Sequence, residues 1–280
     1  MYTTLISAKA LQEHLSDKNC LIVDCRFDLN DTSAGRRAYE EAHIPGAVYV
    51  HLDDDLSGTI IPGVTGRHPL PSIEKLTELF SLWGIDDNVQ VIAYDDKGGG
   101  IASRLWWMLR WLGHQAVAVL DGGWPAWVAA SYPVSNLPAS LRPRMFTARP
   151  QADLQVDADI VDKIRTDPNF TVVDSRAAER YRGEVEPIDP VAGHIPGAIN
   201  LPFPENLKSG TFLDAAQLKE RFEKALAGKA PEQIVFYCGS GVTACHNILA
   251  YAHAGLGNAV LYPGSWSEWI TDEKRDIARG

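Results

Sequence analysis

A cysteine at the end of a predicted strand carries the clearest chemical signal in this sequence. Cys238 begins the run Cys-Gly-Ser-Gly-Val-Thr, which follows an apolar run (233–237) and precedes a helix-like run (245–254). A cysteine at such a junction lies where free backbone N–H groups and the positive end of a helix converge. Because this environment stabilises a thiolate relative to a thiol, the sequence predicts a nucleophilic cysteine that performs sulfur or acyl chemistry.

The elements that would position this cysteine follow a βα pattern. Short Val- and Ile-rich runs alternate with longer amphipathic runs, such as residues 72–83 and 215–226. This alternation is typical of an α/β fold in which a parallel sheet is flanked by helices.

The same ordered set of signals occurs twice, at an offset of about 150 residues. Four segments of the first half are matched in order by four of the second: 21–26 by 171–176, 43–47 by 194–198, 91–95 by 234–238, and 123–127 by 265–269. We therefore predict two domains, residues 1–135 and 153–280, joined by a proline-containing linker at 136–152. Asp95 stands where the second copy has Cys238, so the first domain is predicted to be non-catalytic.

Composition narrows the function classes. The 280 residues carry a formal net charge of −10 and no long Lys/Arg run, which argues against nucleic acid or an anionic membrane surface as partner. No run reaches the ~20 apolar residues of a membrane span, and the N-terminus has no secretory pattern. The four cysteines form no C-x-x-C pair and no zinc-like spacing. We expect a cytoplasmic monomer without a metal.

The chain resembles the tandem rhodanese-domain sulfurtransferases, and within them the subgroup that uses 3-mercaptopyruvate. The resemblance covers nearly the whole chain. It is carried by the doubled His-Ile-Pro-Gly-Ala segments, by the tryptophan-containing segments near each domain end, and by residues 238–243. It implies two rhodanese-like domains, of which the second is catalytic.

The resemblance also implies a reaction. Sulfur from 3-mercaptopyruvate would pass through a Cys238 persulfide to a thiol acceptor such as thioredoxin, or to cyanide, with release of pyruvate. Backbone N–H groups at Gly239, Gly241, Val242 and Thr243 would hold the substrate and the persulfide. No cofactor is implied.

Further site residues follow from the family pattern. Arg180 matches the arginine that binds the substrate carboxylate, since a guanidinium can donate two parallel hydrogen bonds to a carboxylate. Animal members carry another arginine where this chain has Ile188, and Arg182 is an alternative second contact. Ser240, His68 and Asp53 match a Ser-His-Asp relay that moves a proton during the reaction.

Other recurring residues have structural interpretations. His43 and His194 precede the same turn in both copies, including the copy without a cysteine nucleophile, so we expect them to hold that turn. Asp24 and Asp174 recur at strand ends and are expected to tie neighbouring loops. Cys245 is expected in the core.

Three alternatives remain open. A thiosulfate sulfurtransferase would have the same fold, although thiosulfate, whose leaving group is the anion sulfite, favours Lys or Arg within the cysteine loop, and this loop has neither. A cysteine phosphatase of related fold needs a longer loop ending in arginine, where this chain has Ala244. A non-catalytic sulfur carrier would have an unreactive Cys238.

Overall fold

The Val- and Ile-rich runs of the first half form a five-stranded parallel sheet. The computed structural model describes residues 1–280. The strand order is β1-β5-β4-β2-β3, with the bounds β1 Leu5–Ile6, β2 Cys20–Asp24, β3 Val48–Tyr49, β4 Gln90–Tyr94 and β5 Val117–Leu120. Every residue of β5 is buried, as expected for a parallel strand covered on both faces.

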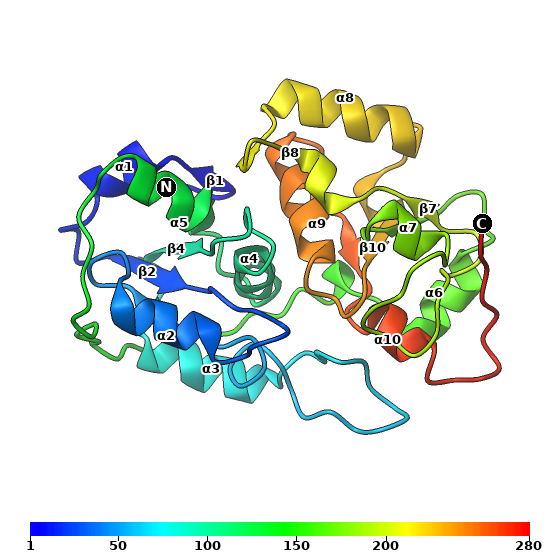
Figure 1. The fold of residues 1–280 in the computed structure, drawn as a ribbon, viewed down its shortest axis with the longest axis horizontal. Helices are drawn as coiled ribbons and strands as arrows, with labels where there is room; N and C mark the ends of the chain where they lie inside the picture. Colours follow the sequence, from blue (N-terminus) through cyan, green and yellow to red (C-terminus); the bar gives the residue numbers. More distant parts are fainter. The chain divides into compact units, whose positions relative to one another are not determined.

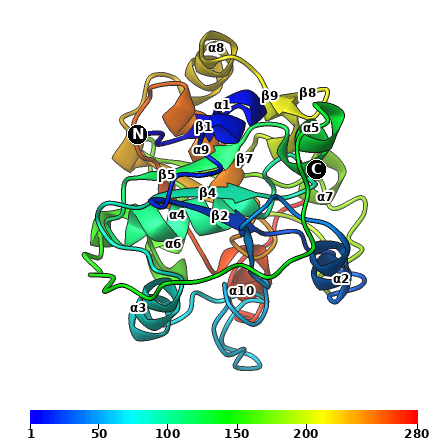
Figure 2. The same ribbon diagram turned by 90° about the vertical axis from the view of Figure 1, so that its left-hand side faces the viewer.

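Helices cover both faces of this sheet. Figures 1 and 2 show α1 and α5 on one face and α3 and α4 on the other. The helices are α1 Ala8–Glu13, α2 Ala34–Glu41, α3 Ile73–Leu82, α4 Ala102–Trp111 and α5 Gly123–Ala129. Serine side chains cap α1 and α3, where Ser7 accepts from the N–H of Ala10 and Ser72 from that of Lys75. All residues of α4 except Arg110 are buried.

The second half repeats this topology with a four-stranded sheet. Its order is β11-β10-β6-β7, all parallel, with the bounds β6 Thr171–Asp174, β7 Ile199–Asn200, β10 Ile234–Tyr237 and β11 Val260–Leu261. These strands correspond to β2, β3, β4 and β5 in the same spatial order. Gln155 makes a parallel bridge to Leu261, in the position that β1 has in the first sheet. The predicted α/β duplication is therefore confirmed.

The helices of the second half also lie on both faces of their sheet (Figure 1). They are α6 Ala158–Ile164, α7 Ala178–Tyr181, α8 Ala215–Leu226, α9 Ala244–His253 and α10 Ser265–Trp269. Shorter elements are the 3-10 turns Ala152–Leu154, Phe203–Asn206 and Pro231–Gln233 and the strands β8 Leu207–Lys208 and β9 Thr211–Phe212. Asp214 and Gln217 form a capping box that begins α8.

Two compact units result, and they exchange short segments. The first unit comprises 1–58, 71–151 and 210–212, and the second comprises 59–70, 152–209 and 213–280. The segment 59–70 thus packs with the second half although it lies within the first half of the sequence. In the other direction, the N–H of Phe212 donates to Asp121 at 2.8 Å in the first unit.

No helix is long and apolar enough to cross a membrane. Nowhere do three or more His, Cys, Asp or Glu side chains gather in a way that could hold a metal ion.

Candidate active site

The cysteine loop, residues 238–243, connects β10 to α9 in the second unit. Cys238 is 2% exposed and its N–H donates to Ser265 Oγ at 3.1 Å. The carbonyl groups of Cys238 and Gly239 accept from the N–H groups of Trp266 and Ser267, at 3.0 and 2.9 Å. Gly241 has a φ of 74° and lies against Pro263, where a Cβ would collide with the Pro263 carbonyl. Residues 238, 239 and 241 of the loop are therefore held against residues 263–267, where α10 begins.

In the first unit, the loop that follows β4 is equivalent to the cysteine loop and surrounds the carboxylate of Asp95. Asp95 follows β4 as Cys238 follows β10, and its side chain is fully buried. Its Oδ1 accepts from the N–H groups of Lys97 and Gly99, both at 2.8 Å. Its Oδ2 accepts from those of Ile101 and Ala102, at 2.7 and 2.8 Å. A strand-to-helix loop of this fold can therefore direct four backbone N–H groups at one anionic group.

Ser240 and His68 meet in the second unit, as the family pattern predicts. His68 Nδ1 lies 2.7 Å from Ser240 Oγ, and both residues are 5% exposed. His68 belongs to the segment 59–70. The residue before it, Arg67, attaches this segment to α10, because the N–H of Arg67 donates to Ser267 Oγ at 3.0 Å. Gly66 is required there, because a Cβ would lie 2.6 Å from the carbonyl oxygen of Gly264.

Asp53, the predicted third member of the relay, belongs to the first unit. It lies in the turn after β3 and is partly buried. Burial raises the pKa of Asp53. Its neighbour Asp55 holds this turn, since Asp55 Oδ2 accepts from the N–H of His51 at 2.8 Å. The geometry within one unit thus brings together Ser240 and His68 and leaves the role of Asp53 a prediction.

Two arginines face Gly239. A Cβ at this position would lie 3.1 Å from Arg67 Nη2 and 3.6 Å from Arg180 Nη2, so glycine leaves room for both guanidinium groups beside the cysteine. Arg180 was predicted from the family pattern, whereas Arg67 was not. Its signal in the sequence is its place directly before His68. The Nε of Arg67 is buried and has no hydrogen-bond partner within the protein.

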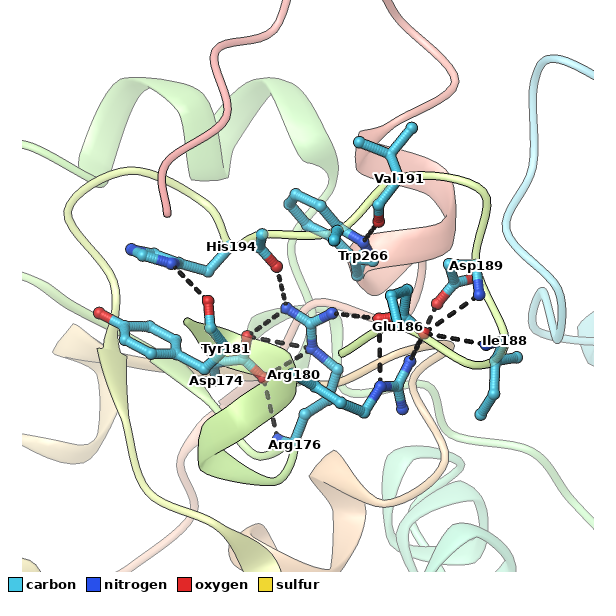
Figure 3. A network of polar contacts seen from close by, with 12 residues as sticks. Asp174, Arg176, Arg180, Tyr181, Glu186, Ile188, Asp189, Val191, His194 and Trp266 are labelled. Carbon is cyan, nitrogen blue, oxygen red and sulfur yellow. Dashed lines mark hydrogen bonds and ion pairs between the residues drawn. The ribbon is translucent and has the colours of Figure 1, made fainter. Parts of the chain in front are cut away.

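These arginines belong to an alternating charge chain, shown from Asp174 to Asp189 in Figure 3. It runs from Asp174 through Arg176, Glu186, Arg180 and Asp189 to Arg67. Neighbours are joined by ion pairs, of 2.6 Å between Arg180 and Glu186 and 3.2 Å between Arg180 and Asp189. The three guanidinium groups balance the three carboxylates, so these six side chains together have a formal charge of zero.

The two carboxylates beside Arg180 are held differently. Burial acts to raise the pKa of Glu186, but hydrogen bonds from Arg180 and from the N–H groups of Ile188 and Asp189 outweigh it and lower the pKa. Burial raises the pKa of Asp189, and the guanidinium groups of Arg67 and Arg180 offset this only in part. Glu186 is therefore the firmer anchor for Arg180.

Arg182, the alternative second arginine for the substrate carboxylate, is not part of this charge chain of six side chains. Its side chain is 43% exposed and pairs with Glu184 at 2.7 Å. Ile188, which stands where animal members have arginine, is 43% exposed. Arg67 is the second arginine that the structure brings to Gly239.

The recurring residues have the structural contacts that were expected of them. His43 Nδ1 contacts the carbonyl of Tyr39 at 2.6 Å, and His194 Nδ1 that of Tyr181 at 2.8 Å. Asp24 and Asp174 each bind the arginine two residues later, at 2.6 Å in both copies. Cys245 is fully buried.

Comparison with known proteins agrees with the fold. The model of the rhodanese-like domain matches residues 7–130 and 157–272. A Pseudomonas aeruginosa protein named "Probable 3-mercaptopyruvate sulfurtransferase" is 49% identical over 278 residues, which are 99% of this chain and 98% of that protein. The "Thiosulfate sulfurtransferase" of Mus musculus is 32% identical over 280 residues, 96% of this chain and 93% of that protein. The solved structure "3-mercaptopyruvate sulfurtransferase from Leishmania major" has a TM-score of 0.84 at 32% identity and covers 95% of this chain and 74% of that one. From the doubled sheet, the cysteine loop and these likenesses, we conclude that the chain belongs to the rhodanese family and contains two rhodanese-like domains.

Proposed function

We propose that this protein is a 3-mercaptopyruvate sulfurtransferase that carries the transferred sulfur as a persulfide on Cys238. One observation carries the proposal: Cys238 begins a loop in which Ser240 contacts His68 at 2.7 Å while two guanidinium groups face Gly239. This site offers a nucleophile, a route for a proton and a clamp for a carboxylate. The name of the Pseudomonas aeruginosa relative supports the choice of donor.

In the first half-reaction, the Cys238 thiolate attacks the sulfur of 3-mercaptopyruvate. A sulfur–sulfur bond forms and the carbon–sulfur bond breaks, and its electron pair stays on carbon as the enolate of pyruvate. The proton of the donor thiol passes to Ser240 and His68 and returns to that carbon. Asp53 is the third member we propose for this relay, as the group that orients His68.

The persulfide anion is then held by backbone N–H groups of Gly239, Gly241, Val242 and Thr243. Asp95 supports this role, because the equivalent loop of the first unit gives four N–H groups to its carboxylate. Arg180 and Arg67 bind the substrate carboxylate, since guanidinium groups are suited to that geometry.

In the second half-reaction, a thiol acceptor such as thioredoxin, or cyanide, attacks the outer sulfur and restores the Cys238 thiolate. None of the four cysteines is in a disulfide bond. We place the reaction in the cytoplasm, where thiols stay reduced, and assign it to a monomer that needs no cofactor.

Intact-mass measurement tests the proposal. After incubation with 3-mercaptopyruvate, the wild type should gain one sulfur atom and release pyruvate, whereas Cys238→Ser should do neither. Cys20→Ser is the matched control, because Cys20 is the cysteine that is not fully buried, and it should behave as the wild type. A sulfur gain that persists in Cys238→Ser would refute the assignment.

A thiosulfate sulfurtransferase is the second candidate. The cysteine loop itself contains no basic residue, but the structure brings Arg67 and Arg180 to it, and positive charge beside the cysteine favours a dianionic donor. The name of the Mus musculus relative points the same way. If kcat/KM for thiosulfate exceeds that for 3-mercaptopyruvate, this candidate replaces the first.

A further inference from the structure

The two arginines at Gly239 raise a question of charge. Thiosulfate carries two negative charges and 3-mercaptopyruvate carries one. Two guanidinium groups without counter-charges would favour the dianion, because attraction grows with the charge of the ligand. The protein's own carboxylates therefore decide how much positive charge a donor meets.

Asp189 is the carboxylate that contacts both arginines. Its Oδ1 pairs with Arg67 Nη1 and its Oδ2 lies 3.2 Å from Arg180 Nη2. Its side chain is only 3% exposed, so water screens this charge weakly. Figure 3 shows Glu186 and Asp189 next to each other beside the Arg180 guanidinium, whose Nη2 contacts both carboxylates.

Glu186 differs from Asp189 because it binds the loop backbone and Arg176 in addition to Arg180. It binds Arg180 through both oxygens and also contacts Arg176 at 3.2 Å, and its Oε1 accepts from the N–H groups of Ile188 and Asp189. It thus fixes the loop 186–189. Arg67 has no carboxylate partner other than Asp189 among the ion pairs of the structure.

From this geometry we propose that Asp189 determines donor specificity, by balancing the charge of Arg67 and Arg180 so that the site accepts a monoanionic donor in preference to a dianionic one. The proposal rests on the proposed sulfurtransfer function and adds to it the residue that selects the donor. Asp189 touches the arginines rather than the reacting atoms, so it is a positioning and charge-balancing residue.

The ratio of kcat/KM for thiosulfate to kcat/KM for 3-mercaptopyruvate is the quantity that isolates charge. A partly unfolded protein lowers both values together and leaves the ratio unchanged, whereas displacement of an arginine lowers the ratio, the opposite of the change expected from loss of the Asp189 charge. Removal of the Asp189 charge acts more strongly on dianionic thiosulfate than on monoanionic 3-mercaptopyruvate, so it raises the ratio. One unit charge at roughly 7 Å, in a partly screened site, is expected to change the ratio roughly tenfold.

The experiment measures thiocyanate formation from each donor with cyanide as acceptor. Asp189→Asn should raise the ratio about tenfold. Asp189→Glu keeps the charge and should stay within about threefold of the wild type. Glu184→Gln is the matched control, because it removes an exposed carboxylate from Arg182 nearby, outside the charge chain. It should leave the ratio unchanged.

Arg67→Gln provides a test of opposite sign that does not depend on the folding of the Asp189 variants. It removes a positive charge and should lower the ratio about tenfold. An unchanged ratio in active Asp189→Asn, or a rise of equal size in Asp189→Glu, would overturn the role of Asp189. A wild type that transfers sulfur from neither donor would instead overturn the proposed function itself.

Discussion

The four N–H groups around Asp95 allow a quantitative prediction for the first unit. Asp95→Ala removes an acceptor that is fully buried and hydrogen-bonded at 2.7 to 2.8 Å. A hydrogen bond to a charged group contributes roughly 1.5–3 kcal/mol, so four independent bonds would give roughly 6–12 kcal/mol. Bonds to one carboxylate are not independent, and water can enter the space that alanine leaves. We therefore expect a loss of about 4 kcal/mol in the free energy of unfolding of the first unit.

Urea unfolding followed by tryptophan fluorescence is the appropriate assay. Trp106, Trp107 and Trp127 are buried in the first unit, so their emission reports its unfolding. With an m-value of about 2 kcal/mol/M, a loss of about 4 kcal/mol lowers the midpoint by about 2 M. Asp95→Asn keeps one of the two oxygens and should lie between alanine and the wild type.

Asp96→Ala is the matched control, because Asp96 is the next residue and is exposed. It should change the midpoint by less than about 0.3 M. The reasoning would be refuted if Asp95→Ala shifted the midpoint by less than about 0.5 M with an unchanged m-value, because the four bonds would then contribute almost nothing.

Three further predictions concern the site and the pH dependence of stability. His68→Gln loses the contact with Ser240 and should lower kcat for 3-mercaptopyruvate by about 10²-fold with a smaller change in KM, and a normal kcat would exclude the relay. Arg180→Lys cannot donate in parallel to a carboxylate and should raise KM about tenfold, which steady-state kinetics would show. Burial lowers the pKa of His114 in the folded protein. As the pH falls below about 6.5, the unfolded state therefore binds a proton at His114 more readily than the folded state does, and the first unit loses stability. His114→Leu should reduce this loss, measured as the difference between urea midpoints at about pH 7.5 and about pH 5.5, and an identical difference in the variant would contradict the cause.

Local patterns were enough to predict much of the fold. The duplicated strands and the loop of Cys238 are signalled by residues that are neighbours in sequence, because strand burial and the strand-to-helix turn are local properties. The meeting of Ser240 with His68 joins positions 172 residues apart, and it was accessible only through the resemblance to a family.

Other features depend on packing that no local pattern encodes. Arg67 and Asp189 are 122 residues apart, and their pairing follows from the association of segment 59–70 with the second unit. Periodicity does not reveal that exchange, since the segment lacks a regular element. Asp95 was visible as a mismatch to Cys238, but its four bonds follow from the backbone of the loop rather than from residue identity.

The exchanged segment also limits how this duplicated gene could be divided. A polypeptide that starts at residue 152 would contain Cys238, Ser240 and Arg180, yet it would lack the histidine and the arginine supplied by residues 59–70. The first copy, although it carries Asp95 where the second has Cys238, encodes two of the side chains that contact or face the loop of Cys238, His68 at Ser240 and Arg67 at Gly239. A copy without a cysteine at this position therefore still contributes side chains to the surroundings of Cys238, so a cut between the two halves of the sequence would divide one cluster of residues.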